Sequence, residues 1–349
     1  MEYKMNVNKK IVSRLPLCYC IAPIQLAGKR YFAVASEKEY ACLLFDEDGR
    51  MIDKIWDGPG GTMSISQIPG IDGAFLAIQK FYSPNNSKEA KLVMCRYNNG
   101  EWEVRTVAEM PYIHRFDILE RDNEYYLLAC CLKSNYEYKD DWRFPGRTYG
   151  CKLPNDLGSL WTCTLDFQLL KDSMLKNHGY FRYMKDNVEK GLVTCQNGVF
   201  LFTPPSSVDN CWDIKKIISD PTSDAVMIDM DSDGEDELLT LSPFHGDKLR
   251  IYHNTSSGYT LCFEYEHRID FAHAICSGSI CGKNRVIVGH RKGKRELLSV
   301  SYDRGNYHVE VLDSDVGPAN VVHYKYKGKD ILISANREIS EIAYYELTD

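Results

Sequence analysis

Short apolar runs recur in groups of four along the chain, separated by turn sequences rich in Gly, Asn and Asp. A clear group begins after Ser223 and reads AVMIDM, ELLTLS, KLRIYHN and YTLCFEYE. Short runs with many Val, Ile, Tyr and Phe residues are typical of β-strands. The first run of each group begins near one residue of the following series: Cys18, Ser64, His114, His178, Ala225, His273 and His323.

Consecutive starts are 46 to 64 residues apart, which is the repeat length of β-propeller blades. The pattern therefore predicts an all-β fold, a single seven-bladed β-propeller domain over residues 1–349. The longest interval indicates an insertion at about residues 136–157. The fourth unit, with SSVDNCWDIKKIISD, leaves little room for two full outer strands.

The two ends of the sequence predict how the ring closes. The last group has only three runs, whereas the segment Lys10–Leu15 precedes the first group and has no partner there. Because a free sheet edge is a liability, we expect this N-terminal strand to complete the last blade. Its partner is the strand around Ile342–Leu347.

Charge and composition argue against several classes of partner. The chain has 42 Lys and Arg against 49 Asp and Glu, a formal net charge of −7, which disfavours nucleic acid and anionic membranes. No apolar run approaches the roughly 20 residues of a membrane span, and the N-terminus lacks the apolar core of a secretory signal. We therefore expect a cytoplasmic protein whose 13 cysteines are mostly buried and reduced. Whether the protein forms a homo-oligomer stays open.

An acidic loop lies between the first two runs of the fifth group. Its carboxylates are Asp229, Asp231, Asp233 and Glu237, and Gly234 permits a tight turn. Several hard oxygen donors around one turn suit Ca²⁺, with Mg²⁺ as the alternative ion. The loop resembles the calcium loop of FG-GAP (integrin-like) propeller repeats, with Glu237 in the position of the last Asp. We expect a structural ion here, the alternative being a solvated acidic turn.

Six of the nine histidines are expected on one face of the ring. In a propeller, the start of a first strand and the end of a second strand share one rim of the central channel. By this topology the rim receives His114, His178, His245, His273, His290 and His323. The remaining His253, His267 and His308 are expected as surface residues of outer strands. Imidazole clusters suit Zn²⁺ or a similar transition metal, whereas a single histidine is more often structural.

The same rim is expected to carry groups for a hydroxylated or anionic ligand. Arg115 and Arg291 supply charge. Two loops supply aromatic side chains, one through Trp56 and the other through Tyr136, Trp142 and Tyr149. Aromatic walls around polar groups suit sugar rings, although plain loop packing explains these aromatics equally well.

Several motifs resemble the propeller domain of aldos-2-ulose dehydratases, which also act on 1,5-anhydrofructose. They are LSPFHGDKLRIYHN, FAHAICSGSICGKNRVIVGHRKGKRELL, NHGYF and IHRFDIL. The resemblance covers mainly the third to seventh units and lacks the cupin and lectin domains of the fungal type. It implies a catalytic zinc in the propeller and elimination of water from a keto-sugar.

The resemblance implies a hydro-lyase with a small-molecule sugar substrate. We expect the metal ligands among His178, His245, His273 and His290. As acid and base we expect His114 and His323, with Arg115 and Arg291 beside them. The division between ligands and acid or base groups stays open, as does the sugar. The alternatives are a non-catalytic propeller that binds glycan or protein, and a sugar-lactone hydrolase.

Overall fold

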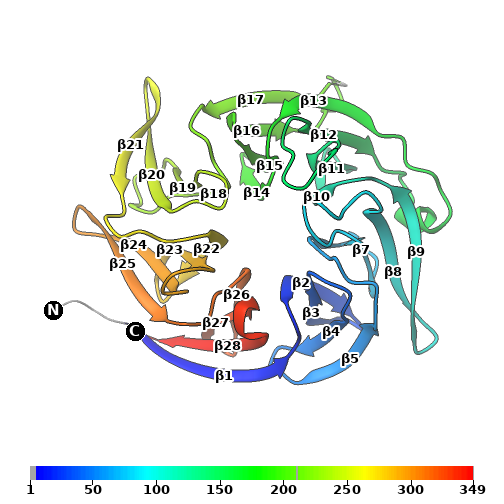
Figure 1. Cartoon of the computed structure of the whole chain (residues 1–349), viewed down its shortest axis with the longest axis horizontal. Helices are drawn as coiled ribbons and strands as arrows, with labels where there is room; N and C mark the ends of the chain where they lie inside the picture. The colour runs from blue at the N-terminus through cyan, green and yellow to red at the C-terminus, as the bar shows by residue number, and fades with distance from the viewer. Residues whose placement is uncertain (1–4, 210, 349) are drawn as a thin grey trace.

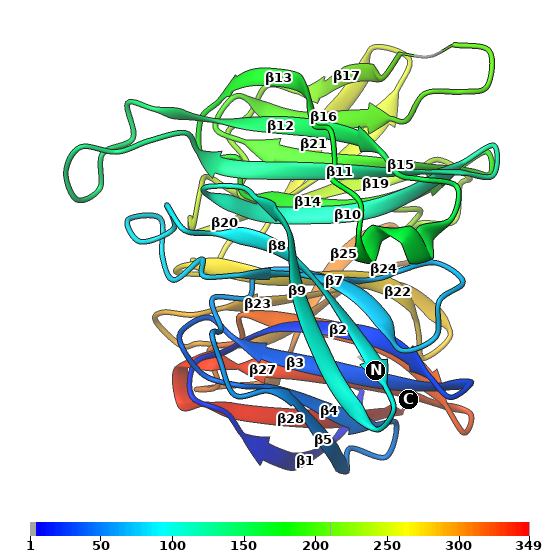
Figure 2. The same cartoon turned by 90° about the vertical axis from the view of Figure 1, so that its right-hand side faces the viewer.

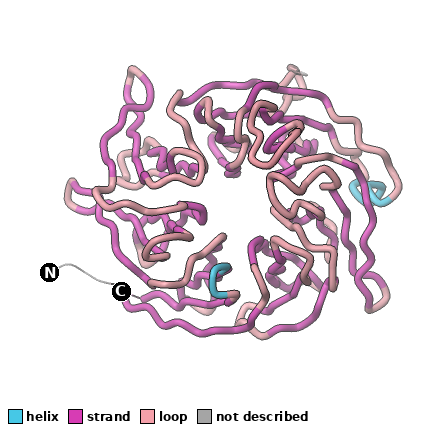
Figure 3. The backbone as a smooth tube through the Cα atoms, in the orientation of Figure 1, coloured by secondary structure: helices cyan, strands magenta, loops and turns pink. Residues whose placement is uncertain are grey.

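The computed structural model describes residues 5–209 and 211–348. Seven antiparallel four-stranded sheets surround a central channel (Figure 1). Within the described residues the helical structure consists of two short turns, η1 (Leu157–Trp161) and η2 (Arg337–Ile339), as Figure 3 shows. The predicted all-β, seven-bladed propeller is confirmed.

Each blade begins at the channel with its inner strand and continues outward. Blades 1 and 2 contain β2 (Cys18–Leu26), β3 (Lys29–Ser36), β4 (Cys42–Asp46), β5 (Met51–Trp56), β6 (Ile65–Gln67), β7 (Ala74–Gln79), β8 (Lys91–Asn98) and β9 (Glu101–Glu109). Blades 3 and 4 contain β10 (Ile113–Arg121), β11 (Glu124–Lys133), β12 (Pro145–Lys152), β13 (Gln168–Met174), β14 (Gly179–Lys185), β15 (Val188–Cys195), β16 (Gly198–Thr203) and β17 (Asp213–Ile218).

Blades 5 to 7 follow the same plan, and blade 7 takes its outer strand from the start of the chain. Blades 5 and 6 contain β18 (Asp224–Ile228), β19 (Glu237–Ser242), β20 (Lys248–Thr255), β21 (Gly258–Glu264), β22 (Ala272–Ile280), β23 (Lys283–His290), β24 (Leu297–Asp303) and β25 (Asn306–Asp313). Blade 7 contains β26 (Asn320–Tyr326), β27 (Lys329–Asn336), β28 (Glu341–Thr348) and β1 (Asn6–Arg14).

Burial explains why the sequence shows continuous apolar runs. The second strands β7 and β19 are buried at every position, because neighbouring blades cover both faces. The outer strands β9 and β21 are largely exposed or half-buried and carry many polar residues. All 13 cysteines are free, and most are buried. No helix among the described residues is long and apolar enough to cross a bilayer.

Ring closure occurs as the sequence predicts. Strand β1 pairs antiparallel with β28, from Asn6 opposite Thr348 to Arg14 opposite Glu341. Figure 1 shows the blue first strand beside the red last one, and Figure 2 shows them side by side at one edge of the molecule. Lys9 adds an ion pair of 2.7 Å to the buried Glu341. The closure leaves β28 with a partner on each side.

The third and fourth blades differ in detail from expectation. The extra residues of blade 3 lie in two connections, 134–144 and 153–167, so the segment 136–157 includes the regular strand β12. The first connection projects from the ring between β11 and β12 (Figure 2). Blade 4 has two full outer strands, β16 and β17, despite its short sequence. The sequence interpretation is wrong here because β16 ends at Thr203, before the stretch SSVDNCWDIKKIISD, so this stretch has to supply only β17.

Candidate active site

Three histidines from three consecutive blades meet at the mouth of the channel. His178 directly precedes β14, His273 is the second residue of β22, and His245 lies in the connection between β19 and β20. One ring nitrogen of each lies within 4.8 Å of a ring nitrogen of the other two. We call this set the histidine trio. It arises because the start of an inner strand and the end of a second strand reach the same rim.

His178 is fixed by groups at the start of blade 5. Its Nδ1 lies 2.9 Å from Asp224 Oδ2 and 3.2 Å from the backbone oxygen of Ser223. Both side chains are buried. Because a carbonyl oxygen only accepts, Nδ1 carries the hydrogen in the neutral ring, and Nε2 carries the lone pair. A carboxylate behind a histidine in this way orients the ring and strengthens it as a metal ligand.

His273 is fixed in the same tautomer. Its Nδ1–H donates to the backbone oxygen of Ala319 at 2.8 Å, and its Nε2 accepts from the Tyr19 hydroxyl at 2.9 Å. Burial lowers the pKa of His273 well below its usual range, and the Arg291 charge adds to the effect. Burial also raises the pKa of Tyr19 to about 12. At neutral pH the ring is therefore uncharged and the hydroxyl keeps its proton.

His245 completes the trio between two aromatic rings. It stacks on Phe244 with centroids 3.9 Å apart and on Phe271 at 4.2 Å. Its Nε2 lies 3.2 Å from His178 Nε2. The backbone of His245 has φ of 48°, a left-handed conformation that costs energy for a residue with a side chain. Burial and the neighbouring His178 lower the pKa of His245, so this ring too is neutral at pH 7.

His114 lies next to the trio. Its ring centroid is 4.6 Å from that of His178, and its Nδ1–H donates to the His178 backbone oxygen at 3.0 Å. Burial and the neighbouring His178 lower the pKa of His114 well below its usual value. The neutral ring therefore has its lone pair on Nε2, which suits a proton acceptor.

The structure separates His290 and His323 from the other four rim histidines. His290 stands at the end of β23, but its Nδ1–H donates to Lys292 at 2.9 Å and its Nε2 accepts the Glu296 N–H at 3.1 Å. Its own turn therefore uses both nitrogens. His323 is the fourth residue of β26, because this strand begins at Asn320, and it donates to Asp330 at 2.7 Å. It therefore lies in the middle of its strand rather than at the rim.

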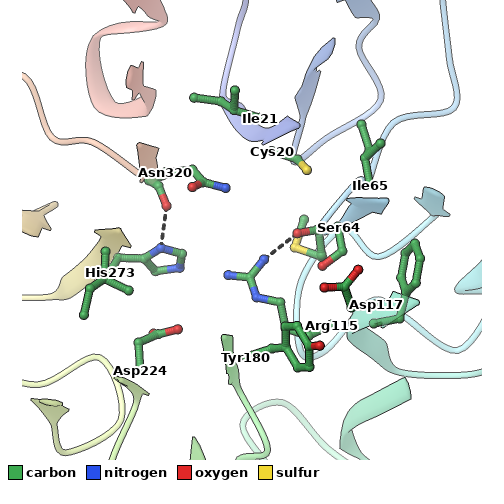
Figure 4. A pocket seen from close by; sticks show the side chains of 14 residues that line it. Cys20, Ile21, Ser64, Ile65, Arg115, Asp117, Tyr180, Asp224, His273 and Asn320 are labelled. Atoms are coloured by element: carbon green, nitrogen blue, oxygen red, sulfur yellow. Dashed lines mark hydrogen bonds between the residues drawn. The ribbon is translucent and has the colours of Figure 1, made fainter. Parts of the chain in front are cut away.

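The two predicted arginines occupy different surroundings. Arg115 lines the channel beside His273, and its Nη1 donates to the Met63 backbone oxygen (Figure 4). Arg291 lies over the Phe271 ring, 4.7 Å from the centroid, and its Nε donates to Glu338 at 2.8 Å. Arg291 is thus paired with a carboxylate, whereas Arg115 contacts a neutral group.

The aromatic residues of the two predicted loops also occupy different surroundings. Trp142, in connection 134–144, packs edge-on against Phe244 at 5.4 Å and so adjoins the trio. Tyr136 lies 5.4 Å from the Lys133 ammonium group, which is also 4.5 Å from the Trp142 ring. Lys133 is fully buried, and among the described residues its Nζ has no hydrogen-bond partner. Trp56 is buried in the hydrophobic core, and Tyr149 packs against the same core, as Tyr136 and Trp142 also do.

The acidic loop gathers most of its carboxylates around one point. Asp229, Asp231 and Glu237 have oxygens within 4.8 Å of one another, and Asp231 and Asp233 form a second such group with His253. Gly234 has φ of 95°, which allows its N–H to donate to Asp229 Oδ2 at 3.1 Å. Among the described residues the other oxygen of Asp229 is buried without a partner. An unpartnered buried carboxylate oxygen fits a bound cation.

Two groups in this loop depart from the sequence interpretation. Glu237 is fully buried, with Oε2 accepting the Met230 N–H at 2.6 Å and Oε1 lying 2.9 Å from His253 Nδ1. Its oxygens therefore already have partners. His253 is accordingly no ordinary surface residue, and its hydrogen bond to Glu237 raises its pKa. The sequence did not reveal this pairing because His253 lies one strand further out, on β20.

Several site residues escape sequence reasoning. Phe244 and Phe271 directly flank or closely precede trio histidines, and that adjacency was a usable signal. Asp224 opens the inner strand of blade 5, next to a residue that the repeat had marked. Tyr19 and Lys133 gave no such signal, since only the closed ring brings Tyr19 to His273.

Comparison with known proteins identifies the fold. No protein-family model matches the sequence. No curated protein matches it either. Among solved structures, virginiamycin B lyase from Staphylococcus aureus aligns with a TM-score of 0.63 and 13% identity, covering 98% of this chain and 99% of that one. A streptogramin B lyase gives 0.60 and 13%, covering 98% of each chain.

Another similar structure is the β-propeller domain of Myceliophteria thermophila Cps50 (Swd1). Its TM-score is 0.61 at 10% identity, covering 97% of this chain and 99% of that domain. Likeness at these identities establishes the fold alone. The protein is a seven-bladed β-propeller that gathers three histidines at the mouth of its channel.

Proposed function

We propose that the protein is a metal-dependent carbohydrate lyase that eliminates water from a keto-sugar such as 1,5-anhydrofructose or an aldos-2-ulose. The observation that carries the proposal is the histidine trio, which offers three ring nitrogens to one centre. The motif resemblance to aldos-2-ulose dehydratases supports the same reaction. Two of the propellers with similar structure are themselves named as lyases.

The trio fits a zinc ion by the chemistry of its donors. His178 and His273 each donate Nδ1–H to a backbone oxygen, which leaves Nε2 as the donor nitrogen. The low pKa values of His245 and His273 keep those rings neutral, as metal ligation requires. Three nitrogens with a remaining open position are the usual set for a catalytic zinc. When bound, zinc would supply Lewis acidity toward a ketone oxygen.

The surrounding residues would carry the proton transfer and hold the sugar. His114 is the proposed base, because its neutral ring has a free lone pair on Nε2 beside the trio. It would take the proton from the carbon next to the keto group and, as the imidazolium, return it to the departing β-hydroxyl, which would leave as water. Arg115 would bind substrate oxygens, and Phe244 and Trp142 would exclude water on the side of His245. His323 and Arg291 have no direct part in this scheme.

The acidic loop is the proposed site of a second, structural ion, calcium or magnesium. Asp229 and Asp231 would supply its main oxygens, with Asp233 beside them. The buried, unpartnered oxygen of Asp229 supports this assignment. Glu237 would stabilise the turn through Met230 and His253 rather than act as a free ligand.

The test combines metal analysis with turnover. Zinc-loaded wild-type protein should convert 1,5-anhydrofructose to a product with the ultraviolet absorbance of a conjugated enone. His178→Ala should lose metal and turnover together, whereas the exposed His267→Ala should keep both. Folded wild-type protein that takes up no stoichiometric transition metal, or shows no turnover of either sugar class when loaded, would refute the lyase. A non-catalytic glycan- or protein-binding propeller would then be the better assignment.

A further inference from the structure

A cavity of about 220 Å³ lies in the channel beside the trio, and residues in or next to the inner strands line it. Two residues of its wall connect it to the trio: His273 is a member of the trio, and Asp224 contacts His178. Ligand pockets usually measure roughly 300–1,000 Å³, so this cavity suits one end of a ligand whose reacting part lies at the trio. The side chains on its wall therefore select what that end can be.

Arg115 is the cation of this cavity. Figure 4 shows its guanidinium group extending into the space between His273 and Ser64. The group donates from Nη1 to the Met63 backbone oxygen, and its carbon lies 5.8 Å from the Tyr19 ring centroid. It forms no ion pair with a carboxylate of the described residues. An arginine that lines a cavity without an acidic partner has a planar donor edge available for a ligand.

Both carboxylates on the cavity wall already have hydrogen-bond partners. Asp117 accepts from Arg182 Nε at 2.8 Å and from the Ser66 hydroxyl at 2.7 Å. Asp224 lies 2.9 Å from His178 Nδ1. Asn320, opposite, uses its Oδ1 to accept the Val321 N–H, so its remaining polar group is an NH₂ donor. Arg115 is the cation among the residues that line the cavity, and its guanidinium group and the Asn320 NH₂ group offer donors to a ligand.

We propose that this cavity binds a carboxylate group, so that the keto-sugar preferred at this site is one that carries a carboxylate. The inference rests on the proposed function, because it assigns the substrate class of the same site. One guanidinium matches a carboxylate in charge and in bidentate geometry. A phosphate would bring about two negative charges close to Asp117 and Asp224, with a single arginine to balance them. The wall favours the singly charged group.

The experiment compares two sugars that differ at one carbon. D-glucuronate and D-glucose share their ring and hydroxyls, but only the first has a carboxylate. Isothermal titration of zinc-loaded wild-type protein should show at least tenfold tighter binding of glucuronate. In Arg115→Gln the preference should fall below about twofold, because one charge-assisted pair accounts for it. Arg105→Gln removes an exposed arginine of β9 and should keep the wild-type preference.

Equal affinity of the wild type for the two sugars, or binding of neither, overturns the inference. So does a preference that survives in Arg115→Gln. If that variant fails to fold, Arg115→Lys decides, since a point charge without the planar fork should lower the preference at least threefold. Titration requires no turnover, so the two proposals fail separately. Dehydration of 1,5-anhydrofructose without any carboxylate preference would remove this inference alone, and carboxylate preference without turnover would remove the lyase alone.

Discussion

The Nε2 atoms of His178 and His245 lie 3.2 Å apart, although the two residues belong to different blades. His178 is committed to donate from Nδ1, so its Nε2 presents a lone pair to His245. Such a contact needs either a hydrogen on the His245 nitrogen or a cation shared by both rings. The proposed metal satisfies the second condition, and it makes the contact sensitive to single substitutions.

Substitution of two rim histidines distinguishes the trio from the wider set expected from topology. His273→Ala should lower zinc content at least tenfold, because a three-nitrogen site seldom tolerates the loss of one ligand. His290→Ala should keep the metal, since both nitrogens of that ring serve their own turn. Metal analysis of the two purified variants measures this. Loss of zinc in both would place His290 back among the ligands.

Asp224→Asn tests the positioning of His178. The amide keeps the shape of the side chain but removes the charge that faces Nδ1 at 2.9 Å. We expect zinc affinity to fall about 10- to 100-fold, as for other residues that orient metal ligands. Competition with a chelator measures it, and the melting temperature at saturating zinc serves as the control for folding. An unchanged affinity would show that Asp224 has no positioning role.

Tyr19→Phe separates metal ligation from simple hydrogen bonding at His273. In the metal-free protein the Tyr19 hydroxyl occupies the Nε2 lone pair that zinc would need. Removing it should destabilise metal-free protein by about 1 kcal/mol, the usual worth of one hydrogen bond. Zinc affinity should stay equal or rise, because the competing donor is gone. A drop in affinity would mean that the Tyr19 hydroxyl supports the metal site rather than competing with the metal for His273 Nε2.

The acidic loop can be tested by thermal melting with chelator and with added calcium. Wild-type protein should gain about 2.7 kcal/mol of stability when calcium is 100-fold above its dissociation constant. The double variant Asp229→Ala and Asp231→Ala should lose this gain, and Glu101→Ala, in an exposed hairpin, should keep it. If wild-type melting ignores chelator, calcium and magnesium alike, the loop is an acidic turn without a metal.

Lys133→Met should stabilise the protein at neutral pH by about 1 kcal/mol, because it removes a buried amine without a hydrogen-bond partner. Burial lowers the pKa of Lys133 below its usual 10.5. The unfolded chain therefore binds this proton more tightly. The energetic cost of burying the charged group is greatest below the folded-state pKa and vanishes as pH rises toward 10.5.

The difference between the Lys133→Met variant and the wild type should accordingly shrink in alkaline solution. Urea melts at several pH values measure it. Lys29→Met, at an exposed position, should show no such trend. A variant that is less stable than wild type at neutral pH would mean that the aromatic rings of Tyr136 and Trp142 stabilise the charge more than burial opposes it.

Turn residues and apolar runs predict the fold closely, because each blade is built from segments that are neighbours in sequence. Six of the seven inner strands begin within one residue of the expected position, and β26 begins three residues early. That shift explains His323, since moving along a strand takes a side chain away from the rim. His290 stands apart from the trio for another reason. Topology predicts where a residue lies. It does not predict that Lys292 and Glu296 will form hydrogen bonds with both ring nitrogens of His290.

The contacts around the trio could not be predicted from the sequence. Tyr19 and His273 are 254 residues apart and touch only across the closed ring. The burial that lowers the pKa of His245 comes from the neighbouring blades and from its stacking on Phe244 and Phe271. Patterns along the chain locate the rim, and packing between blades decides which rim residues act together.

Strand β1 leaves the ribosome before the other strands of the propeller, whereas its partner β28 is the last of them. Blades 1 to 6 can each form from a continuous stretch of nascent chain, but blade 7 must wait for Glu341–Thr348. Until then, Val12 and the rest of β1 have no sheet to join. A chain stalled before Glu341 would present open strand edges on both sides of the gap. The speed of translation through the last blade should therefore govern how much of the newly made protein aggregates.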